Sequence, residues 1–215
     1  TMANRSTSGF GLRMAMRLGN TPAIGGQSKY AIKSGLGVGI FKGNPASIQL
    51  AGDTGFIQDS AFSTTDDGND GGIDFTTAND ALLVGVHNGV FFIDNTTNKP
   101  TFANSVAAST TFGTNPNTNS TDGVAFVNDD PDQEYVVKAD AAVGQAIFGL
   151  CGNINDFAAG DAKDGASTAT FDSGTQGETK MFRIVRSAED PDNEDLTVAG
   201  ANIIVVINAA ANTYR

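Results

Sequence analysis

The feature that most constrains this chain is the alternation of short apolar runs with stretches of small, turn-forming residues. Among its 215 residues are 26 glycines. Gly, Asn and Asp favour turns, whereas the helix formers Leu, Glu and Lys are scarce here. We therefore expect an all-β protein: a barrel-like or sandwich body of about nine to twelve short strands, with at most one or two short helices.

The segment 81–93 carries the clearest strand signal. Two β-rich runs, 81–87 and 90–93, flank Asn88-Gly89, a dipeptide typical of the two-residue turn of a β-hairpin. The sequence therefore predicts a hairpin here. Near the other end of the chain, the run 203–207 is continuously β-branched and predicts a strand buried on both faces.

Two further segments have less regular patterns. Residues 29–50 predict two strands around a turn at 42–45, and glycines alternate with apolar residues over 35–39. Such alternation would let another sheet or chain pack closely on one face of a strand. Residues 139–150 could form one short helix, with Asp140 placed to cap it.

An acidic turn occurs twice in the second half of the chain. Asp130-Pro131-Asp132 and Asp190-Pro191-Asp192 each follow an apolar run, and each precedes a Glu and a second apolar run, at 135–137 and 196–198. Proline presets φ, and Asp accepts local backbone N–H bonds. The sequence therefore predicts strand, turn and strand in both places.

Charge is distributed unevenly along the chain. Residues 1–52 contain six bases and no Asp or Glu, whereas the remainder holds seven bases and 24 acids. Residues 1–28 also lack periodicity, so we expect an extended N-terminal arm followed by a β-rich body over 29–215. A subdivision of the body near residue 120 is left open.

A basic arm on an acidic body can bind an acidic neighbour, a nucleic acid or its own body. The bases are too widely spaced for a typical nucleic-acid footprint, so a protein partner is favoured and direct nucleic-acid binding is not expected. The candidate partner-binding residues are Arg5, Arg13, Arg17, Lys29 and Lys33.

The residue types that catalysis and metal binding need are sparse. His87 is the only histidine and Cys151 the only cysteine, which excludes a typical zinc site and an internal disulfide. Cys151 lies in an apolar run and is predicted to be a small buried residue. The acidic loop 66–72 resembles a calcium loop only loosely, because the alternation of ligands is not met. We expect no enzyme activity and no cofactor.

The sequence contains neither a candidate membrane span nor a typical secretory signal. The apolar runs are far shorter than the roughly 18 residues that a membrane span needs. Residues 1–20 contain three arginines but no apolar stretch typical of a secretory signal. We therefore expect no membrane partner.

Several segments together resemble a known group of proteins. They include a Lys-Gly-Asn-Pro turn before a strand, the run around His87 and the β-branched run near the C-terminus. The chain is similar to the small virion structural proteins of marine tailed bacteriophages. The matching segments are 41–50, 83–92, 99–102, 125–131 and 200–208.

The resemblance implies a role but offers no catalytic residues. Such proteins include capsid cement or decoration proteins, which bind the major capsid protein on the outer head shell. It implies a homo-oligomer, with a trimer favoured, made in the host cytoplasm and located on the capsid surface of the virion. Two alternatives stay open: a tail-tube or other tail subunit, and a calcium-assisted glycan-binding adhesin that uses the loop Asp66–Asp70.

Overall fold

A computed structural model describes residues 4–23, 25–48, 55–59, 83–155, 160–178 and 180–214. Within them the chain is mainly β, and the predicted fold class is confirmed. Fifteen strands are described, more than predicted, because three of them are only two residues long. The elements are β1 (Arg13–Arg17), β2 (Thr21–Pro22), β3 (Ser28–Ile32), β4 (Ile40–Phe41), β5 (Pro45–Ile48), β6 (Ile57–Asp59), β7 (Leu83–Ile93), β8 (Pro100–Ala103), β9 (Ser105–Val106), β10 (Gly123–Asn128), β11 (Gln133–Lys138), β12 (Cys151–Asn155), β13 (Thr170–Gln176), β14 (Phe182–Ser187), β15 (Asn202–Ile207), and the 3-10 turns η1 (Gln145–Ile147) and η2 (Ala209–Ala211).

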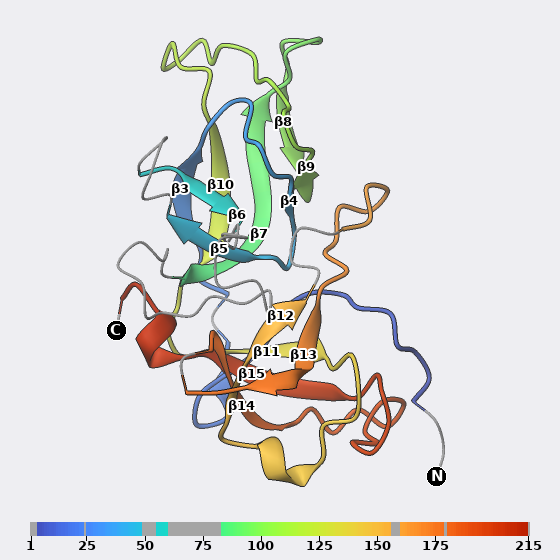
Figure 1. Cartoon of the computed structure of the whole chain (residues 1–215). Coiled ribbons are helices and arrows are strands. Elements are labelled where there is room, and N and C mark those ends of the chain that lie inside the picture. Colours follow the sequence, from blue (N-terminus) through green and yellow to red (C-terminus); the bar gives the residue numbers. More distant parts are fainter. Residues whose placement is uncertain are drawn as a thin grey trace.

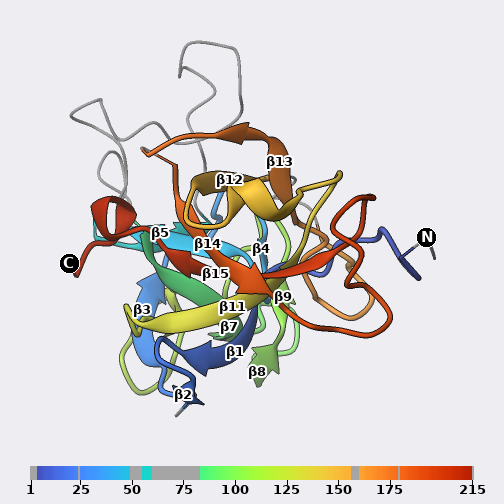
Figure 2. The same cartoon turned by 90° about the horizontal axis from the view of Figure 1, so that it is seen from below.

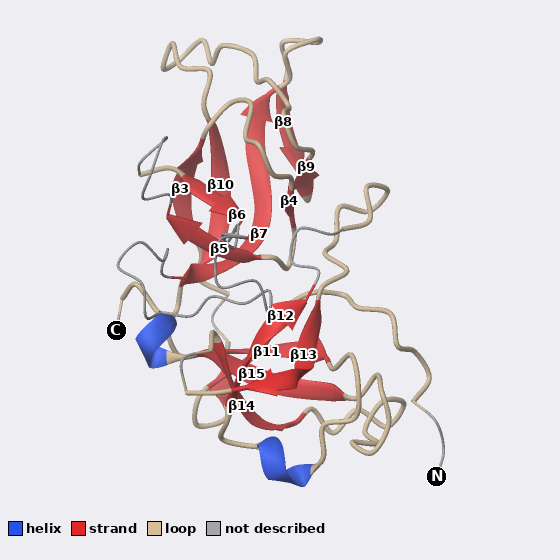
Figure 3. Ribbon diagram, in the orientation of Figure 1, coloured by secondary structure: helices blue, strands red, loops and turns tan. Residues whose placement is uncertain are grey.

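The strands form two lobes, one above the other in Figure 1. The central lobe is built from the middle of the chain and contains a six-stranded and a two-stranded sheet. The terminal lobe is built on a seven-stranded sheet that combines β1 and β2 with β11 to β15. Figure 3 shows how little of the chain is helical, since only the two 3-10 turns appear as helix.

The central lobe is organised around the long strand β7. Its larger sheet has the order β3-β10-β7-β5-β6, and β8 pairs with the upper half of β7. The edge strands β3 and β6 come close to each other, so the sheet is strongly curved. Its concave side encloses a core of buried aliphatic and aromatic residues that includes Ile32, Ile40 and Ile57. β4 and β9 form the small separate sheet beside it.

The terminal lobe has the order β13-β12-β14-β15-β11-β1-β2, all antiparallel (Figure 2). β15 lies between β14 and β11, and all six of its residues are buried. The predicted strand at 203–207, buried on both faces, is therefore confirmed. The three bulkiest fully buried side chains, Tyr135, Phe171 and Phe182, pack in this lobe.

The predicted hairpin at Asn88-Gly89 is wrong, because β7 runs straight through it as one strand of 11 residues. β10 pairs with β7 on both sides of this point, with Phe126 opposite Gly89 and Val127 opposite His87. Asn88 is thus an extra residue, a β-bulge. Gly89 has φ 151°, a conformation that suits glycine and accommodates the bulge.

Three other local predictions also differ from the structure. The only helical part of residues 139–150 is the short turn η1, and Asp140 instead accepts a hydrogen bond from the backbone N–H of Ser173 within β13. Residues 196–198 form a turn, and Leu196 packs against the terminal core. Of the glycines over 35–39, Gly35 and Gly37 lie in a loop with open space around them, and only Gly39 is packed closely, with a Cβ position 3.2 Å from the Val106 carbonyl oxygen.

The chain divides at a different place from the one left open. The chain enters the central lobe between β2 and β3, and because β10 belongs to the central lobe and β11 to the terminal lobe, it returns at the turn 129–132. The lobes also share a strand: Leu83 and Val86 of β7 pack in the terminal core, whereas Val84 and Val90 pack in the central core. The lobes are therefore two parts of one packed body.

Candidate functional site

Residues 4–22, here called the N-terminal segment, lie against the chain's own body (Figure 1). β1 extends the terminal sheet along the edge of β11, with Met14 opposite Tyr135. Leu12 is buried in the terminal core, and its N–H donates to the carbonyl of Gly43 in the central lobe at 2.9 Å. The segment predicted as an extended arm is thus bonded to both lobes.

The two Asp-Pro-Asp turns hold this segment at two points along its length. Arg17 Nε lies 2.6 Å from Asp130 Oδ2, and Arg5 Nη1 lies 2.9 Å from Asp192 Oδ2. A basic arm can bind an acidic neighbour, a nucleic acid or its own body. In this structure two of its arginines bind the chain's own body. Part of the positive charge of the N-terminal segment is therefore paired with carboxylates of the same chain.

Hydrogen bonds to its backbone also hold the N-terminal segment in place. The N–H of Ser6 donates to Asn193 Oδ1 at 3.2 Å, and its carbonyl accepts from Lys138 Nζ at 2.8 Å. Gly200, with φ 87°, lies under the same residue, where a Cβ would come within 2.5 Å of the Ser6 carbonyl oxygen. Only glycine fits this position without displacing the segment.

The other predicted partner-binding residues lie at separate places. The Arg13 guanidinium is 4.2 Å from the centre of the Phe10 ring. Lys29 is on β3 opposite Phe126 of β10, and Lys33 directly follows β3. The five basic residues therefore do not form one site.

The exposed apolar surface of the central lobe is an aromatic row, defined as Phe91, Phe102 and Phe126. Phe91 of β7 pairs in register with Phe102 of β8, and their ring centroids are 4.7 Å apart. Phe102 is also 6.3 Å from Phe126 of β10. Phe102 is 73% exposed, the most exposed of the large apolar side chains in the described residues. An exposed aromatic row of this kind is typical of a binding surface.

The strand that carries Phe102 lies at an edge. β8 pairs only with β7 among the strands described, so its outer edge carries backbone groups without a neighbouring strand. Edge strands of this kind readily pair with another chain. Lys29, opposite Phe126, adds a positive charge to the same face. The aromatic row and the edge of β8 together offer apolar contact and a template for strand addition.

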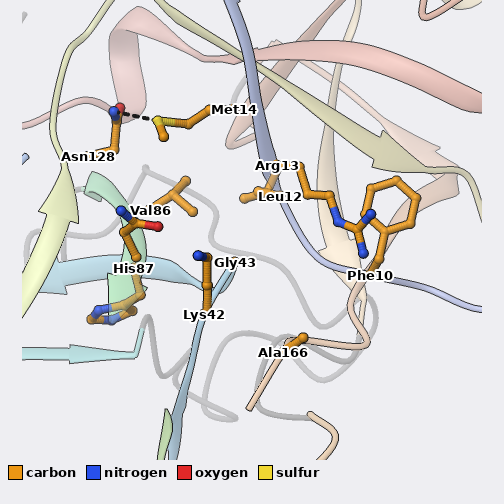
Figure 4. Close-up of a pocket in the computed structure, with 11 residues that line it drawn as sticks. Phe10, Leu12, Arg13, Met14, Lys42, Gly43, Val86, His87, Asn128 and Ala166 are labelled. Atoms are coloured by element: carbon orange, nitrogen blue, oxygen red, sulfur yellow. Dashed lines mark hydrogen bonds between the residues drawn. The ribbon is translucent and has the colours of Figure 1, made fainter. Parts of the chain in front are cut away.

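A cavity of about 320 Å³ lies at the junction of the lobes (Figure 4). The N-terminal segment forms one wall, and β7 and the turn before β5 form the others. Lys42 projects into the space beside Val86 and Leu12, whereas Arg13 is turned toward Phe10. The lining residues are Phe10, Leu12, Arg13, Met14, Lys42, Gly43, Val86, His87, Asn88, Asn128 and Ala166.

Asn128, at the end of β10, fixes one side of this cavity. Its Nδ2 lies 2.8 Å from Met14 Sδ and donates to the carbonyl of Gly26 at 2.9 Å. Its Oδ1 accepts from the hydroxyl of Tyr135 at 2.9 Å. Gly85 passes so close to the Asn128 carbonyl that a Cβ there would collide with it. One asparagine thus connects both lobes and the N-terminal segment.

His87, on β7, is 1% exposed. The sequence predicts a strand-end residue near the surface, which is wrong, because β7 continues through Asn88-Gly89 and places His87 inside the strand. Its Nε2 lies 3.2 Å from the Gln58 carbonyl of β6 and, as the donor to that carbonyl, carries the proton. Burial lowers the pKa of His87 to about 4, so the ring is neutral at pH 7. The ring is turned toward β6 and contributes no positive charge to the cavity.

Sequence reasoning did not find the aromatic row or the cavity. Phe91 and Phe126 lie in the continuous apolar runs 90–93 and 124–127, so no alternation in the sequence marks their exposed faces. That Phe102 joins them depends on the pairing of β8 with β7, which no local pattern indicated. The cavity joins five distant stretches of chain and had no signal in the sequence.

Within the described residues, no group of three or more His, Cys, Asp or Glu is arranged to hold a metal. The acidic loop 66–72, which resembles a calcium loop only loosely, lies outside the described residues. Cys151 is 2% exposed, as predicted, and burial raises the pKa of its thiol. No helix in the described part of the chain is long and apolar enough to cross a membrane.

Comparison with known proteins identifies no relative of this chain. No family model matches it, and neither the curated proteins nor the solved structures contain a match.

Proposed function

We propose that this chain is a structural protein of a tailed-bacteriophage virion, in the first place a decoration protein that binds the outer head shell. The observation that carries the proposal is the exposed Phe102 on an edge strand, stacked in the aromatic row. A protein that works through a docking surface needs a rigid apolar patch, and a curved β-sheet supplies one. The resemblance of the sequence to small virion proteins supports the choice of partner.

The structure changes which part of the chain would dock. Arg5 and Arg17 already pair with acidic turns of the same chain, so the N-terminal segment has less charge to offer a partner than its sequence suggests. The aromatic row, with Lys29 beside it, is the better docking surface. Repetition of this surface around a symmetric shell would multiply modest contacts into avidity.

The test is co-sedimentation of the purified protein with empty head shells of the phage that encodes it. Phe102→Ser removes the exposed ring, and Leu150→Ser is the matched control, because Leu150 is 45% exposed in the terminal lobe. We expect the control to bind like the unchanged protein and Phe102→Ser to bind at least about tenfold more weakly. Failure of the unchanged protein to bind the shells would overturn the decoration role.

Electron microscopy of the purified protein separates the remaining assembly modes. Small closed oligomers, among them the trimer favoured by the sequence, are consistent with a decoration protein. Stacked rings or tubes would indicate a tail-tube subunit instead, with β8 pairing to the next copy.

A further inference from the structure

The interlobe cavity gathers positive charge in a chain of 24 acids and 13 bases. Among the described residues that line it are Arg13 and Lys42, and none of these lining residues is an Asp or Glu. Arg17 and Arg186 are each paired with a carboxylate elsewhere. The Lys42 ammonium, by contrast, makes no hydrogen bond or ion pair to any part of the chain that the structure describes. The Lys42 side chain is exposed, so a ligand anion that enters the cavity can pair with it.

The backbone that carries Lys42 is held from both sides. Its N–H donates to the carbonyl of Gly165 at 3.0 Å, and its carbonyl accepts from the N–H of Ser167 at 2.9 Å. The next residue, Gly43, donates to the His87 carbonyl at 2.8 Å. Lys42 therefore projects from a fixed backbone, which lowers the entropy cost of binding a ligand.

The rest of the cavity wall is largely apolar. Phe10, Leu12, Met14 and Val86 line it, and its volume of about 320 Å³ is at the lower end of the range of small-molecule sites. Inorganic phosphate would leave these side chains without contacts. A compact molecule with a hydrocarbon part and one negative group matches both the walls and the cations.

We propose that the interlobe cavity binds a small amphipathic carboxylate. The carboxylate accepts a hydrogen bond from Lys42, Arg13 adds a second positive charge to the lining while it stays on the Phe10 ring, and the hydrocarbon part packs against Leu12, Met14 and Val86. A molecule seated there contacts the N-terminal segment and both lobes at once. Its binding therefore stabilises the folded protein in proportion to its concentration.

The test uses hexanoate as the probe, with three comparison compounds. Acetate keeps the charge without the tail, hexanol keeps the tail without the charge, and hexylammonium reverses the charge. Titration calorimetry and thermal unfolding are measured at low salt, where screening is weak. We expect saturable binding of hexanoate, with a Kd on the order of 1 mM for so small a ligand, and a rise in Tm. The three comparison compounds should bind at least about tenfold more weakly.

Two lysine variants locate the binding. Lys42→Met keeps the length of the side chain but removes its charge, and Lys99→Met is the control, on an exposed turn before β8. Lys42→Met should weaken hexanoate binding about tenfold, whereas Lys99→Met should leave it unchanged. Equal binding of hexanoate by both variants, or no saturable binding by the unchanged protein, would overturn the proposal.

Discussion

The central and terminal lobes are both antiparallel, but they use the chain in opposite ways. The central lobe takes its strands from one stretch, β3 to β10. The terminal lobe joins the two ends of the chain, because β1 pairs with β11 beside β15. The central lobe is therefore closed within one stretch of chain, although β3 and β10 at its two ends must pair, whereas the terminal lobe is complete only when the N-terminal segment has returned to it.

The same difference appears on the surfaces of the lobes. The central lobe leaves Phe102 exposed on an edge strand, whereas the terminal lobe extends its sheet beyond β11 with β1 and β2. One lobe thus offers an edge to a partner, and the other adds its own N-terminal strands at the corresponding place. β7, which contributes side chains to both cores, makes the lobes interdependent.

The largest expected effect tests this interdependence. Phe182→Ala empties a fully buried site in the terminal core and should lower the free energy of unfolding by about 3–5 kcal/mol. Because Leu83 and Val86 of β7 pack in that core, we expect a single unfolding transition in urea. Hydrogen exchange followed by mass spectrometry should show loss of protection in both lobes. Retained protection of β3 and β10 alone would show that the lobes are independent.

The second prediction concerns the pH dependence of the contact between β7 and β6. Burial lowers the folded-state pKa of His87 to about 4, below its ordinary value near 6.5. The unfolded state therefore binds the extra proton first, and stability falls as the pH drops from about 6.5 toward 4.

This difference in pKa lowers the free energy of unfolding by up to about 3 kcal/mol near pH 4. His87→Gln keeps a donor for the Gln58 carbonyl but does not titrate. Urea unfolding of both proteins between pH 7 and pH 4 measures the effect, and the carboxylates they share cancel in the comparison. Parallel stability curves for the two proteins would contradict the prediction.

A smaller effect is expected at the ion pair across the terminal sheet. Arg186 of β14 donates two hydrogen bonds to Glu134 of β11, at 2.8 and 2.6 Å, and Glu134 is fully buried. Arg186→Met leaves this carboxylate without its cation. Because the Arg186 side chain is 39% exposed and partly screened, we expect a loss of about 2 kcal/mol in the free energy of unfolding at pH 7.

The control for this pair is Arg183→Met on the same strand, where the side chain is exposed. Its effect on the free energy of unfolding should stay within about 0.5 kcal/mol. If Arg183→Met lowered the free energy of unfolding as much as Arg186→Met, the positive charge of β14 in general, rather than the ion pair with Glu134, would be the source of the stability.

The smallest expected losses of stability concern the ion pairs between the N-terminal segment and the two acidic turns. The Asp130 side chain is 15% exposed, so Arg17→Met should cost about 1 kcal/mol of unfolding free energy. Arg5 and Asp192 are 78% and 58% exposed, and solvent screens their pair. Arg5→Met should therefore be nearly neutral. Thermal unfolding at low and high salt checks both, and a larger effect at Arg5 would reverse the order we infer.

Part of this structure follows from the sequence alone. The β-branched run of β15 has no polar face, so it must be buried on both sides, and the structure buries all six of its residues. Cys151 is buried, as its apolar neighbours predict. The abundance of turn formers and the scarcity of helix formers were enough to predict an all-β chain. Burial of an apolar run and overall strand content can be predicted from a short window of sequence.

Long-range pairing decided the rest. Asn88-Gly89 has the chemistry of a hairpin turn, but β10 pairs on both sides of it and holds the strand straight apart from one bulge. The basic N-terminal segment has the composition of a free arm, yet the edge of β11 and two acidic turns bind it. The aromatic row and the interlobe cavity likewise form from residues distant in sequence. A local pattern sets what each segment can do, and the neighbours that folding brings to it select which of these occurs, because backbone pairing and burial outweigh local propensity.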